Sequence, residues 1–443
     1  LNLRNLFWGL AAFFWLPHAA AITIEQAVQQ ALSSNPEVRS AESEVRAAGH
    51  DVRNARAGYF PSLDLNVRYG REHTNIKQLS ISGNDADDLW RRESGVSFSQ
   101  LLWDGNATRS EVARRVALLN GAEHSLNDTR NAMAFRATEV YLDVLRNREL
   151  LSLARTNVDS HMKTLDNVRA KLDSGIGNRA DVNQATARLA LARSTVTARE
   201  GAVLEAEARY ERVVGEHAPA ELAAPVAQPS GMVNEGMIED EQLRASTDNA
   251  QQSALSSHPA AQQSEALVAA ADAVLEGSAS GYHPQLNLEG ALNRDNNISG
   301  VRGNRNSDTV MVVARWNLFR GGADRAEQLA AAERKVAAQD QLDDARRRIA
   351  ENVAIAYQAR ATSESRLVHL QAHVDASQGT LDSYRAQFEL NRRTLLDVLN
   401  AENELFNARS NLVFGKFDDL INIYFVDASK GDLAGAFGGS GTR

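Results

Sequence analysis

Two polar side chains three residues apart, Asp397 and Asn400, are the first candidates for a functional site. Residues at this spacing share one face of an α-helix, so both would point to the same surface. Arg393 lies just before them, and the same pattern occurs earlier in the chain, where Asp181 corresponds to Asp397. Carboxylates attract cations, and a guanidinium can pair with a carboxylate through charge-assisted hydrogen bonds. The pattern therefore indicates a duplicated polar site with electrostatic interactions rather than a chemical reaction.

Motifs for catalysis or cofactor binding are missing from the sequence. It has no phosphate-binding loop, no GxSxG elbow and no HExxH zinc motif. The chain has no cysteine, which removes thiol catalysis and Cys-based metal sites. His369 and His373 are four residues apart, but we interpret them as solvated helix surface and not as a metal site. We expect no catalytic residue, no metal and no cofactor, and the net charge of −9 argues against nucleic acid as the main partner.

The candidate residues lie in two predicted helical hairpins, around Lys171–Leu189 and Gln387–Leu405. No proline occurs from Gly105 to about Asp173, which predicts a helix on the order of 100 Å long before the first turn. Apolar residues recur every seven positions along it, as in Val112, Leu119, Leu126, Met133 and Val140. A strict seven-residue repeat predicts coiled-coil packing between neighbouring helices. The repeat alone does not distinguish a coiled-coil tunnel from an ordinary long bundle in a soluble scaffold protein.

Two alternating segments in each half of the chain predict β-hairpins between the helices. Four strands in two separated pairs are too few to close a barrel, so we expect several protomers to pool them in a membrane. An arginine that faces lipid at mid-membrane costs roughly 2–4 kcal/mol, so Arg315 is expected to face a wet lumen together with Ser97, Ser99 and Val313. The membrane-strand residues expected to face lipid are then Val96, Phe98, Val312 and Trp316.

The chain is predicted to be one structural unit written twice after a signal peptide. Residues 1–21 resemble a secretory signal, with one charge at Arg4, an apolar run and a small-residue cleavage site. The first repeat is expected at 22–214, with short helices at 22–58, a β-hairpin at 59–103 and a long helical hairpin at 105–214. A linker or equatorial region at 215–249 precedes the second repeat at 250–430. That repeat has short helices at 250–280, a β-hairpin at 281–320 and a long helical hairpin at 321–430, and a flexible tail at 431–443 follows.

These motifs together resemble the TolC family of outer-membrane efflux and secretion channels. The resemblance rests on the helix starts NPE and HPA, the strand entries GYFPSLDL and GYHPQLNL, the strand exits WDG and FRGG, and the turns SGIGNRADV and LNRRTLLDVLNA. It implies a mainly α protein with a membrane β-barrel portion. In that family, two-repeat protomers form a homotrimer with a 12-stranded β-barrel and a 12-helix coiled-coil periplasmic tunnel.

The resemblance also implies a gate at the periplasmic tip, closed by acidic rings and links between helices. Asp397 matches one ring position, and Asn400 stands where TolC itself has a second aspartate. Arg393 and Asp181 match partners in the closing network, while Phe388 replaces a tyrosine whose hydroxyl contributes there. We expect Arg393 to pair with Asp181 of a neighbouring hairpin, and the alternative is that Arg393 only neutralises an exposed helix start.

The expected function is a channel in the cell outer membrane that extends into the periplasm and serves type I secretion of a large protein such as an adhesin. The partners implied are two further copies of the chain, a periplasmic adaptor protein, an inner-membrane ABC transporter and outer-membrane lipid. The alternative is the outer-membrane component of a proton-driven efflux pump for small molecules. A periplasmic coiled-coil scaffold without a pore is the remoter alternative, and we expect no enzymatic activity.

Overall fold

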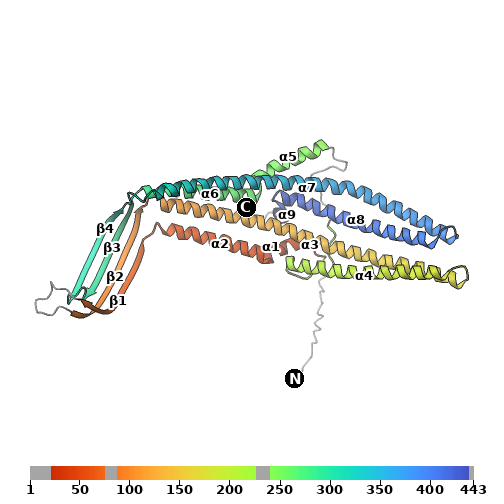
Figure 1. Ribbon diagram of the computed structural model, residues 1–443, viewed down its shortest axis with the longest axis horizontal. Helices are drawn as coiled ribbons and strands as arrows, with labels where there is room; N and C mark the ends of the chain where they lie inside the picture. Colours follow the sequence, from red (N-terminus) through yellow and green to blue (C-terminus); the bar gives the residue numbers. More distant parts are fainter. Residues whose placement is uncertain (1–20, 75–86, 226–239, 439–443) are drawn as a thin grey trace, which may run out of the picture. The chain divides into compact units, whose positions relative to one another are not determined.

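The computed structural model describes residues 21–74, 87–225 and 240–438. The predicted signal peptide therefore lies, except for Ala21, outside the described residues. The chain divides into two compact units, each of which takes segments from both sequence repeats. Unit 1 contains Leu1–Asn35, Arg136–Glu235 and Ser363–Ile423, and unit 2 contains Pro36–Phe135, Gly236–Thr362 and Tyr424–Arg443. The expected fold class, mainly α with a small amount of β-structure, is confirmed (Figure 1).

Unit 1 is built from two long helical hairpins. The first joins the later part of α3 (Ala107–Asp173) to α4 (Arg179–Val214), and the second joins the later part of α7 (Ala323–Glu389) to α8 (Leu395–Ser429). Side chains at the predicted seven-residue spacing pack between the helices of the second hairpin, as with Val374 and Leu381 of α7 against α8. The heptad pattern therefore predicted both the helices and the faces that they bury.

The short helix α1 (Ile24–Ser34) packs against the end of α4 in unit 1. Thr23 and Gln26 form a capping box at its start, which satisfies backbone N–H groups that have no partner within the helix. At its other end, the side-chain amide of Asn35 donates to the carbonyl oxygen of Val213 at 3.0 Å. The Tyr141 hydroxyl of α3 lies 2.8 Å and 2.6 Å from the carbonyl oxygens of Ile22 and Ala223. These contacts fix the start of the described chain to the hairpin α3/α4.

The helices of unit 2 are joined by ion pairs and by a small apolar core. They are α2 (Pro36–Ala57), α5 (Asp240–Ser257), α6 (Pro259–Ser278), the one-turn η2 (Ala279–Tyr282), α9 (Leu433–Phe437) and parts of α3, α7 and α8. Arg115 of α3 pairs with Asp51 of α2 at 2.9 Å, and Lys335 of α7 pairs with Asp272 of α6 at 2.6 Å. Side chains of α5, α6, α7 and the end of α8 form the core, with Val353 and Ala356 fully buried.

The four strands of unit 2 form one antiparallel sheet in the order β1-β2-β3-β4, seen side by side in Figure 1. They are β1 (Ser62–Thr74), β2 (Asp87–Trp103), β3 (Gln285–Asn296) and β4 (Asn304–Arg315). The two predicted hairpins are separated in the sequence but join in one sheet, because β2 pairs with β3 from Arg92↔Asn296 to Trp103↔Leu286. Strands far apart in sequence satisfy their backbone groups here by joining the two hairpins.

Three boundary predictions are also corrected by the structure. The segment 431–443 was expected to be flexible, but α9 lies within it and buries Leu433 and Phe437, because these apolar side chains find a packing surface. Helix α5 begins at Asp240, inside the region 215–249 expected to be linker or equatorial region, so the first short helix of the second repeat starts earlier than the predicted residue 250. Trp316 was expected on a membrane strand, but β4 ends one residue before it, at Arg315.

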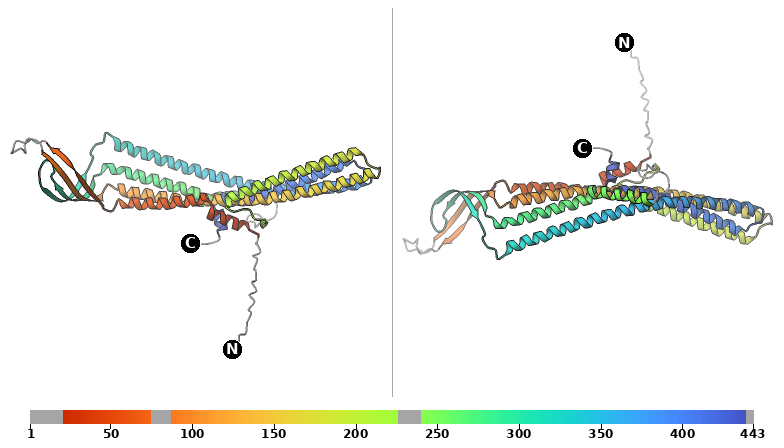
Figure 2. Two further views of the ribbon diagram at one scale, coloured as in Figure 1. Left: turned by 90° about the horizontal axis from the view of Figure 1, so that it is seen from below. Right: turned by 90° about the horizontal axis from the view of Figure 1, so that it is seen from above.

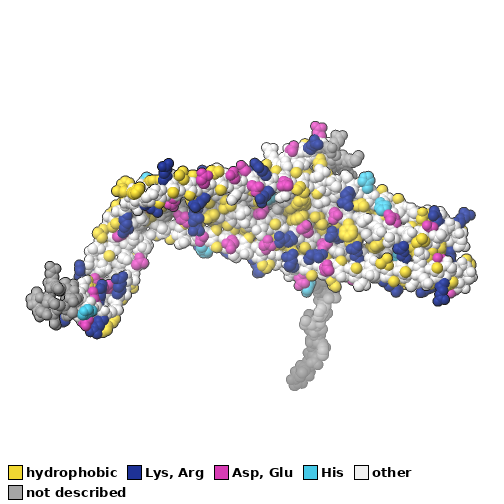
Figure 3. Space-filling model, in the orientation of Figure 1, with side chains coloured by type: hydrophobic (Ala, Val, Ile, Leu, Met, Phe, Trp, Pro, Cys, Tyr) yellow, Lys and Arg dark blue, Asp and Glu magenta, His cyan; other side chains and the backbone are white. Residues whose placement is uncertain are grey.

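Charged side chains of both signs are dispersed over the helical surfaces (Figure 3). Among the described residues, none of the helices combines the length and the apolar character needed to cross a membrane.

Candidate functional site

The turn of the first hairpin is a tight glycine-rich loop between α3 and α4. Gly175 has φ of +79°, a left-handed conformation that glycine adopts without steric cost. The backbone N–H groups of Ile176 and Gly177 both donate to the carbonyl oxygen of Lys171, at 3.0 Å and 2.9 Å. A Cβ atom on Gly177 would lie only 2.8 Å from the backbone nitrogen of Leu172. The turn therefore requires glycine at two positions for two different reasons.

Asp181 is held in the first turn of α4 by Asn178, the N-cap residue. The side-chain oxygen of Asn178 accepts a hydrogen bond from the backbone N–H of Asp181 at 2.8 Å. Its amide nitrogen donates back to the Asp181 carboxylate at 2.9 Å. A carboxylate in this position also interacts favourably with the positive end of the helix dipole. Within the single chain, the predicted gate residue Asp181 therefore stabilises a helix start.

Asp397 takes the equivalent position in the first turn of α8, next to Thr394. Its carboxylate accepts hydrogen bonds from the Thr394 hydroxyl at 2.8 Å and from the Thr394 backbone N–H at 3.2 Å. These two hydrogen bonds, with a smaller contribution from Arg393, hold the pKa of Asp397 below its ordinary value. The site therefore carries a full negative charge at neutral pH.

Arg393 contacts residues of its own hairpin. Its Nη1 atom lies 3.8 Å from the Asp397 carboxylate, and its Nε donates to the side-chain oxygen of Gln387 at 3.0 Å. The guanidinium also lies 4.3 Å from the centre of the Tyr384 ring, a cation–π contact. Within one copy, the described contacts of Arg393 do not include Asp181. The predicted link to Asp181 of a neighbouring copy stays a prediction.

Two contacts between the hairpins were not predicted from the sequence. The ammonium of Lys171, at the end of α3, lies 3.9 Å from the centre of the Phe388 ring and donates to the Phe388 carbonyl oxygen at 3.0 Å. Arg188 of α4 donates to the side-chain oxygen of Asn400 on α8 at 3.1 Å. The predicted gate residue Asn400 thus takes part in a link between the two hairpins. Phe388, which lacks the hydroxyl of a tyrosine, contributes through its ring face.

A buried carboxylate, Glu402, lies two residues after Asn400 on α8, and sequence reasoning also missed it. Glu402 is only 3 % exposed, and one oxygen accepts hydrogen bonds from Thr164 at 2.8 Å and from Arg385 at 2.7 Å. Ser160 donates to the same oxygen at 3.2 Å, and Nδ1 of His161 lies 3.0 Å from the other oxygen. Three helices therefore meet at Glu402, since Ser160, His161 and Thr164 lie on α3 and Arg385 lies on α7. We call these five residues the Glu402 cluster.

The cluster keeps Glu402 ionised despite its burial. Burial alone would raise the pKa of Glu402, but the close contact with His161 and the hydrogen bonds from Arg385 and Thr164 outweigh it and hold the pKa at about 2. The sequence contained one signal for this site. Leu395 and Glu402 are seven residues apart on α8, so Glu402 repeats the position of an apolar residue, but Arg409 follows at the same spacing and the signal is weak.

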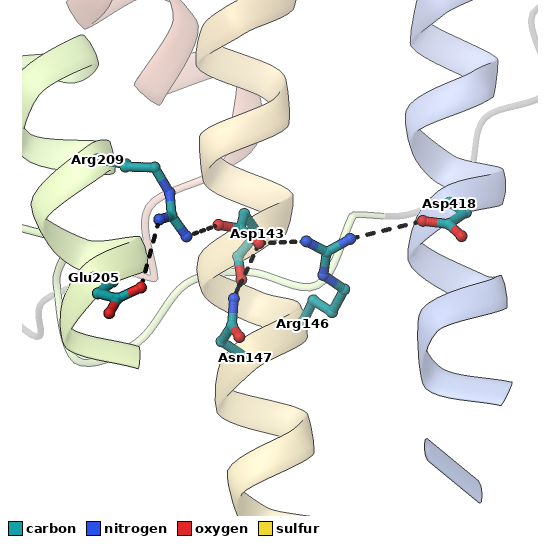
Figure 4. A network of polar contacts seen from close by, with 6 residues as sticks. All are labelled: Asp143, Arg146, Asn147, Glu205, Arg209 and Asp418. Atoms are coloured by element: carbon teal, nitrogen blue, oxygen red, sulfur yellow. Dashed lines mark hydrogen bonds and ion pairs between the residues drawn. The ribbon is translucent and has the colours of Figure 1, made fainter. Parts of the chain in front are cut away.

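A second polar network joins three helices at the other end of the unit 1 hairpins (Figure 4). Asp143 of α3 accepts hydrogen bonds from Arg209 of α4 at 2.7 Å and from Arg146 at 2.5 Å. Arg146 in turn lies 3.6 Å from Asp418 of α8, and its guanidinium is 5.5 Å from the centre of the Phe414 ring. Asp143 and Arg146 are mostly buried, whereas Arg209 and Asp418 are more exposed. Helix α8 is therefore tied to α3 at two levels.

Comparison with known proteins identifies the family. Residues 27–216 and 250–416 match the family described as outer membrane efflux protein. The chain belongs to this family. It is an outer-membrane channel of the TolC type that extends into the periplasm, and it is not an enzyme.

Named relatives cover most of the chain at low identity. The outer membrane efflux protein BepC of Brucella suis is 25% identical, over 94% of this chain and 86% of BepC. The alkaline protease secretion protein AprF of Pseudomonas aeruginosa is also 25% identical, over 94% of this chain and 86% of AprF. The MtrE outer membrane channel of Neisseria gonorrhoeae, solved in its open state, has the same fold, with a TM-score of 0.75 and 16% identity over 92% of this chain and 88% of MtrE.

Proposed function

We propose that three copies of this chain pool their strands into one twelve-stranded membrane barrel and their helices into a twelve-helix periplasmic tunnel. The observation that carries the proposal is the four-stranded sheet, whose outer strands β1 and β4 each have one edge without a partner strand among the described residues. A sheet in lipid must close on itself to satisfy its backbone groups, and four strands are too few to do so.

The side chains of the sheet support the same proposal. The register places Val96 opposite Leu65 and Leu292, and Val312 opposite Leu288, so these side chains share one apolar face. Leu63, Leu65 and Val312 are 71%, 73% and 66% exposed in the single chain. Such a face is unfavourable in water and suits the hydrocarbon region of a bilayer. Val96, Phe98 and Val312 would face lipid, while Ser97, Ser99, Val313 and Arg315 would face the lumen.

The two hairpin turns, at one end of unit 1 (Figure 2), would form the periplasmic gate. Three copies of Asp397 and Asn400 around one axis would give a narrow, negatively charged mouth that attracts cations. The charges would also repel one another, so links between hairpins are needed to hold the closed state. We propose Arg393 with Asp181 of a neighbouring copy as one such link.

Conductance in planar bilayers tests this link. Replacing Asp181 or Arg393 by alanine is expected to raise single-channel conductance, because each change removes one partner of every link in the trimer. The matched control is Arg392→Ala, which removes an adjacent exposed arginine that is not part of the proposed pair. If both link variants conduct like the unmodified protein, the pair does not close the channel. Arg393 then only neutralises Asp397 at the start of α8.

For the cargo, we propose type I secretion of a large protein such as an adhesin. The channel would work with a periplasmic adaptor and an inner-membrane ABC transporter. The name of AprF, a protease secretion protein, supports this assignment. The name of BepC, an efflux protein, supports the second candidate, in which a proton-driven pump passes small molecules to the same channel.

Deletion of the gene separates the two candidates. Loss of a large protein from the culture medium, with unchanged susceptibility to toxic small molecules, would support secretion. Increased susceptibility with unchanged secreted protein would support efflux. Complementation with the intact gene is the control, and the transporter genes encoded alongside give an independent indication of the partner.

A further inference from the structure

The two hairpins of unit 1 are joined along an antiparallel contact between α3 and α8. Near the turns, Leu165 and Val168 of α3 share an apolar cluster with Leu395 and Leu399 of α8. Next along this contact is the Glu402 cluster, with Thr164 and Ser160 of α3. The Asp143 network, where Arg146 of α3 meets Asp418 of α8, lies roughly 24 Å further along α8 at ~1.5 Å per residue (Figure 4). All three contacts fit one axial alignment of the two helices.

The apolar part of this contact does not by itself define that alignment. Val158, Leu165 and Leu172 of α3 are spaced by seven residues, as are Leu399, Phe406 and Val413 of α8. A slide of one heptad, roughly 10 Å, would therefore again place apolar side chains opposite apolar side chains. Sequences with a regular heptad pattern need a polar feature to select one register.

The Glu402 cluster supplies a feature of this kind. Glu402 and Arg385 belong to the same hairpin and would move together in a slide, at 2.7 Å from one another. Thr164, Ser160 and His161 belong to α3, and they reach Glu402 only in the observed alignment. If α8 moved one heptad away from the turns, the carboxylate would lie opposite Leu153, Ala154 and Asn157 of α3, without three of its four partners. Burying a charge without its hydrogen bonds is costly, so this alternative register is disfavoured.

We propose that Glu402 is a positioning residue that sets the axial register between the hairpins α3/α4 and α7/α8. The register decides whether the two turns are level, and so whether Asp181 and Arg393 stand at one height. The inference therefore deepens the proposed gate and rests on it for its functional consequence. The Arg146–Asp418 pair is a weaker constraint, because its atoms are 3.6 Å apart and Asp418 is largely exposed, and ion pairs with a solvated partner contribute about 0–1 kcal/mol.

Strong attachment is a different role from register selection, and the two make different predictions. A buried ion pair often stabilises no more than apolar residues of similar volume, because removing the charges from water opposes their attraction. Replacing the charged part of the cluster by apolar side chains should then keep the protein folded. Register selection should be lost at the same time, because nothing would penalise a slide. Apolar replacement of the cluster is therefore expected to preserve the stability of the protein and to abolish the selection of one register.

The test uses the triple variant His161→Leu, Arg385→Met and Glu402→Leu in the full-length channel. These substitutions replace the charged part of the cluster by apolar side chains.

Cross-linking reports the register between the hairpins. Cysteines are introduced at Lys171 and Asn391, whose side chains lie 3.4 Å apart across the hairpins, and are linked with a short bismaleimide. The natural chain has no cysteine, so only these two positions react. All variants carry the same two cysteines, and denaturing gels distinguish links within one chain from links between chains, because only links between chains give two-chain and three-chain products. Glu404→Leu is the matched control, because Glu404 is exposed and pairs with His373 inside its own hairpin at 2.9 Å.

The expected result is a melting temperature equal to or above that of the parent, with a severalfold fall in the yield of the Lys171–Asn391 link. The control variant should keep the parent yield. A parent yield in the triple variant would overturn the proposal. If the triple variant does not fold, Glu402→Gln decides in the same way: a severalfold fall supports the proposal and an unchanged yield rejects it. A lower yield of the Lys171–Asn391 link together with unchanged single-channel conductance would support the register role of Glu402 and reject the proposed gate.

Discussion

Glu402 makes the stability of unit 1 depend on pH in the acid range. Its carboxyl group has a pKa of about 2 in the folded chain, against an ordinary value of 4.5. A lowered pKa means that the stabilisation is fully present above about pH 4.5 and is lost as the pH falls toward 2. The shift corresponds to at most about 3 kcal/mol. We expect the Glu402→Gln variant to be less stable than the parent at pH 7 and to approach it near pH 2, measured by denaturant unfolding across this range.

Asp397 is expected to carry the cation selectivity of the channel. Its pKa is lowered by the hydrogen bonds from Thr394, so the carboxylate stays charged at least down to its ordinary pKa of 3.8. Asp397→Asn should reduce the preference for cations in reversal-potential measurements at pH 7, and the parent should keep that preference to about pH 4. Asp382, an exposed carboxylate on α7, provides the control as Asp382→Asn. Equal selectivity in parent and Asp397→Asn would assign the cation preference to other residues.

The sequence predicted some residues of the site and missed others for a physical reason. Asp181 and Asp397 were predicted because each follows a turn motif that occurs twice in the sequence, and the structure shows that both lie in the first turn of a helix, where acids are favoured. Lys171 and Arg188 were missed because their partners, Phe388 and Asn400, belong to the other hairpin. No local rule specifies which side chains meet across two hairpins. The expected partner of Arg393 likewise depends on an assembly that a single chain does not contain.

At the scale of elements, the two faces of the sheet should tolerate charge very differently. Phe98 lies opposite Leu63 and Gly290 on the apolar face, and Ser99 lies on the other face opposite Ser62 and Glu289. We expect Phe98→Arg to destabilise the inserted protein by roughly 2–4 kcal/mol, because an arginine at mid-membrane faces lipid there. Ser99→Arg, one residue away, should leave the stability of the inserted protein close to that of the parent. Denaturant unfolding in lipid vesicles gives the comparison, and a larger loss for Ser99→Arg would invert the assignment of the faces.

Helices and strands were predictable to different degrees. The seven-residue repeat and the lack of proline predicted α3, α4, α7 and α8, because these signals are local and are repeated over many turns. The alternation of apolar and polar residues also predicted the strands. The pairing of β2 with β3 was not predicted, because these strands come from different repeats and their register depends on side chains far apart in sequence. The short helix α9 was missed because its five residues are stabilised by packing and not by helix propensity.

At the scale of the whole molecule, the outer edges of β1 and β4, which have no partner strand in the part of the chain that the structure describes, predict the assembly. If each β1 pairs with β4 of the next copy, cysteine pairs with one member on each edge strand should form links between chains. A scan of such pairs in outer membranes should give two-chain and three-chain products on denaturing gels, since the natural chain adds no cysteine of its own. The matched control is the pair Ser97→Cys and Ala291→Cys, which lie directly opposite on β2 and β3 and should link only within one chain. A membrane-inserted monomer that conducts, without links between chains, would contradict the trimeric barrel, because four strands would then have closed a pore that their number does not allow.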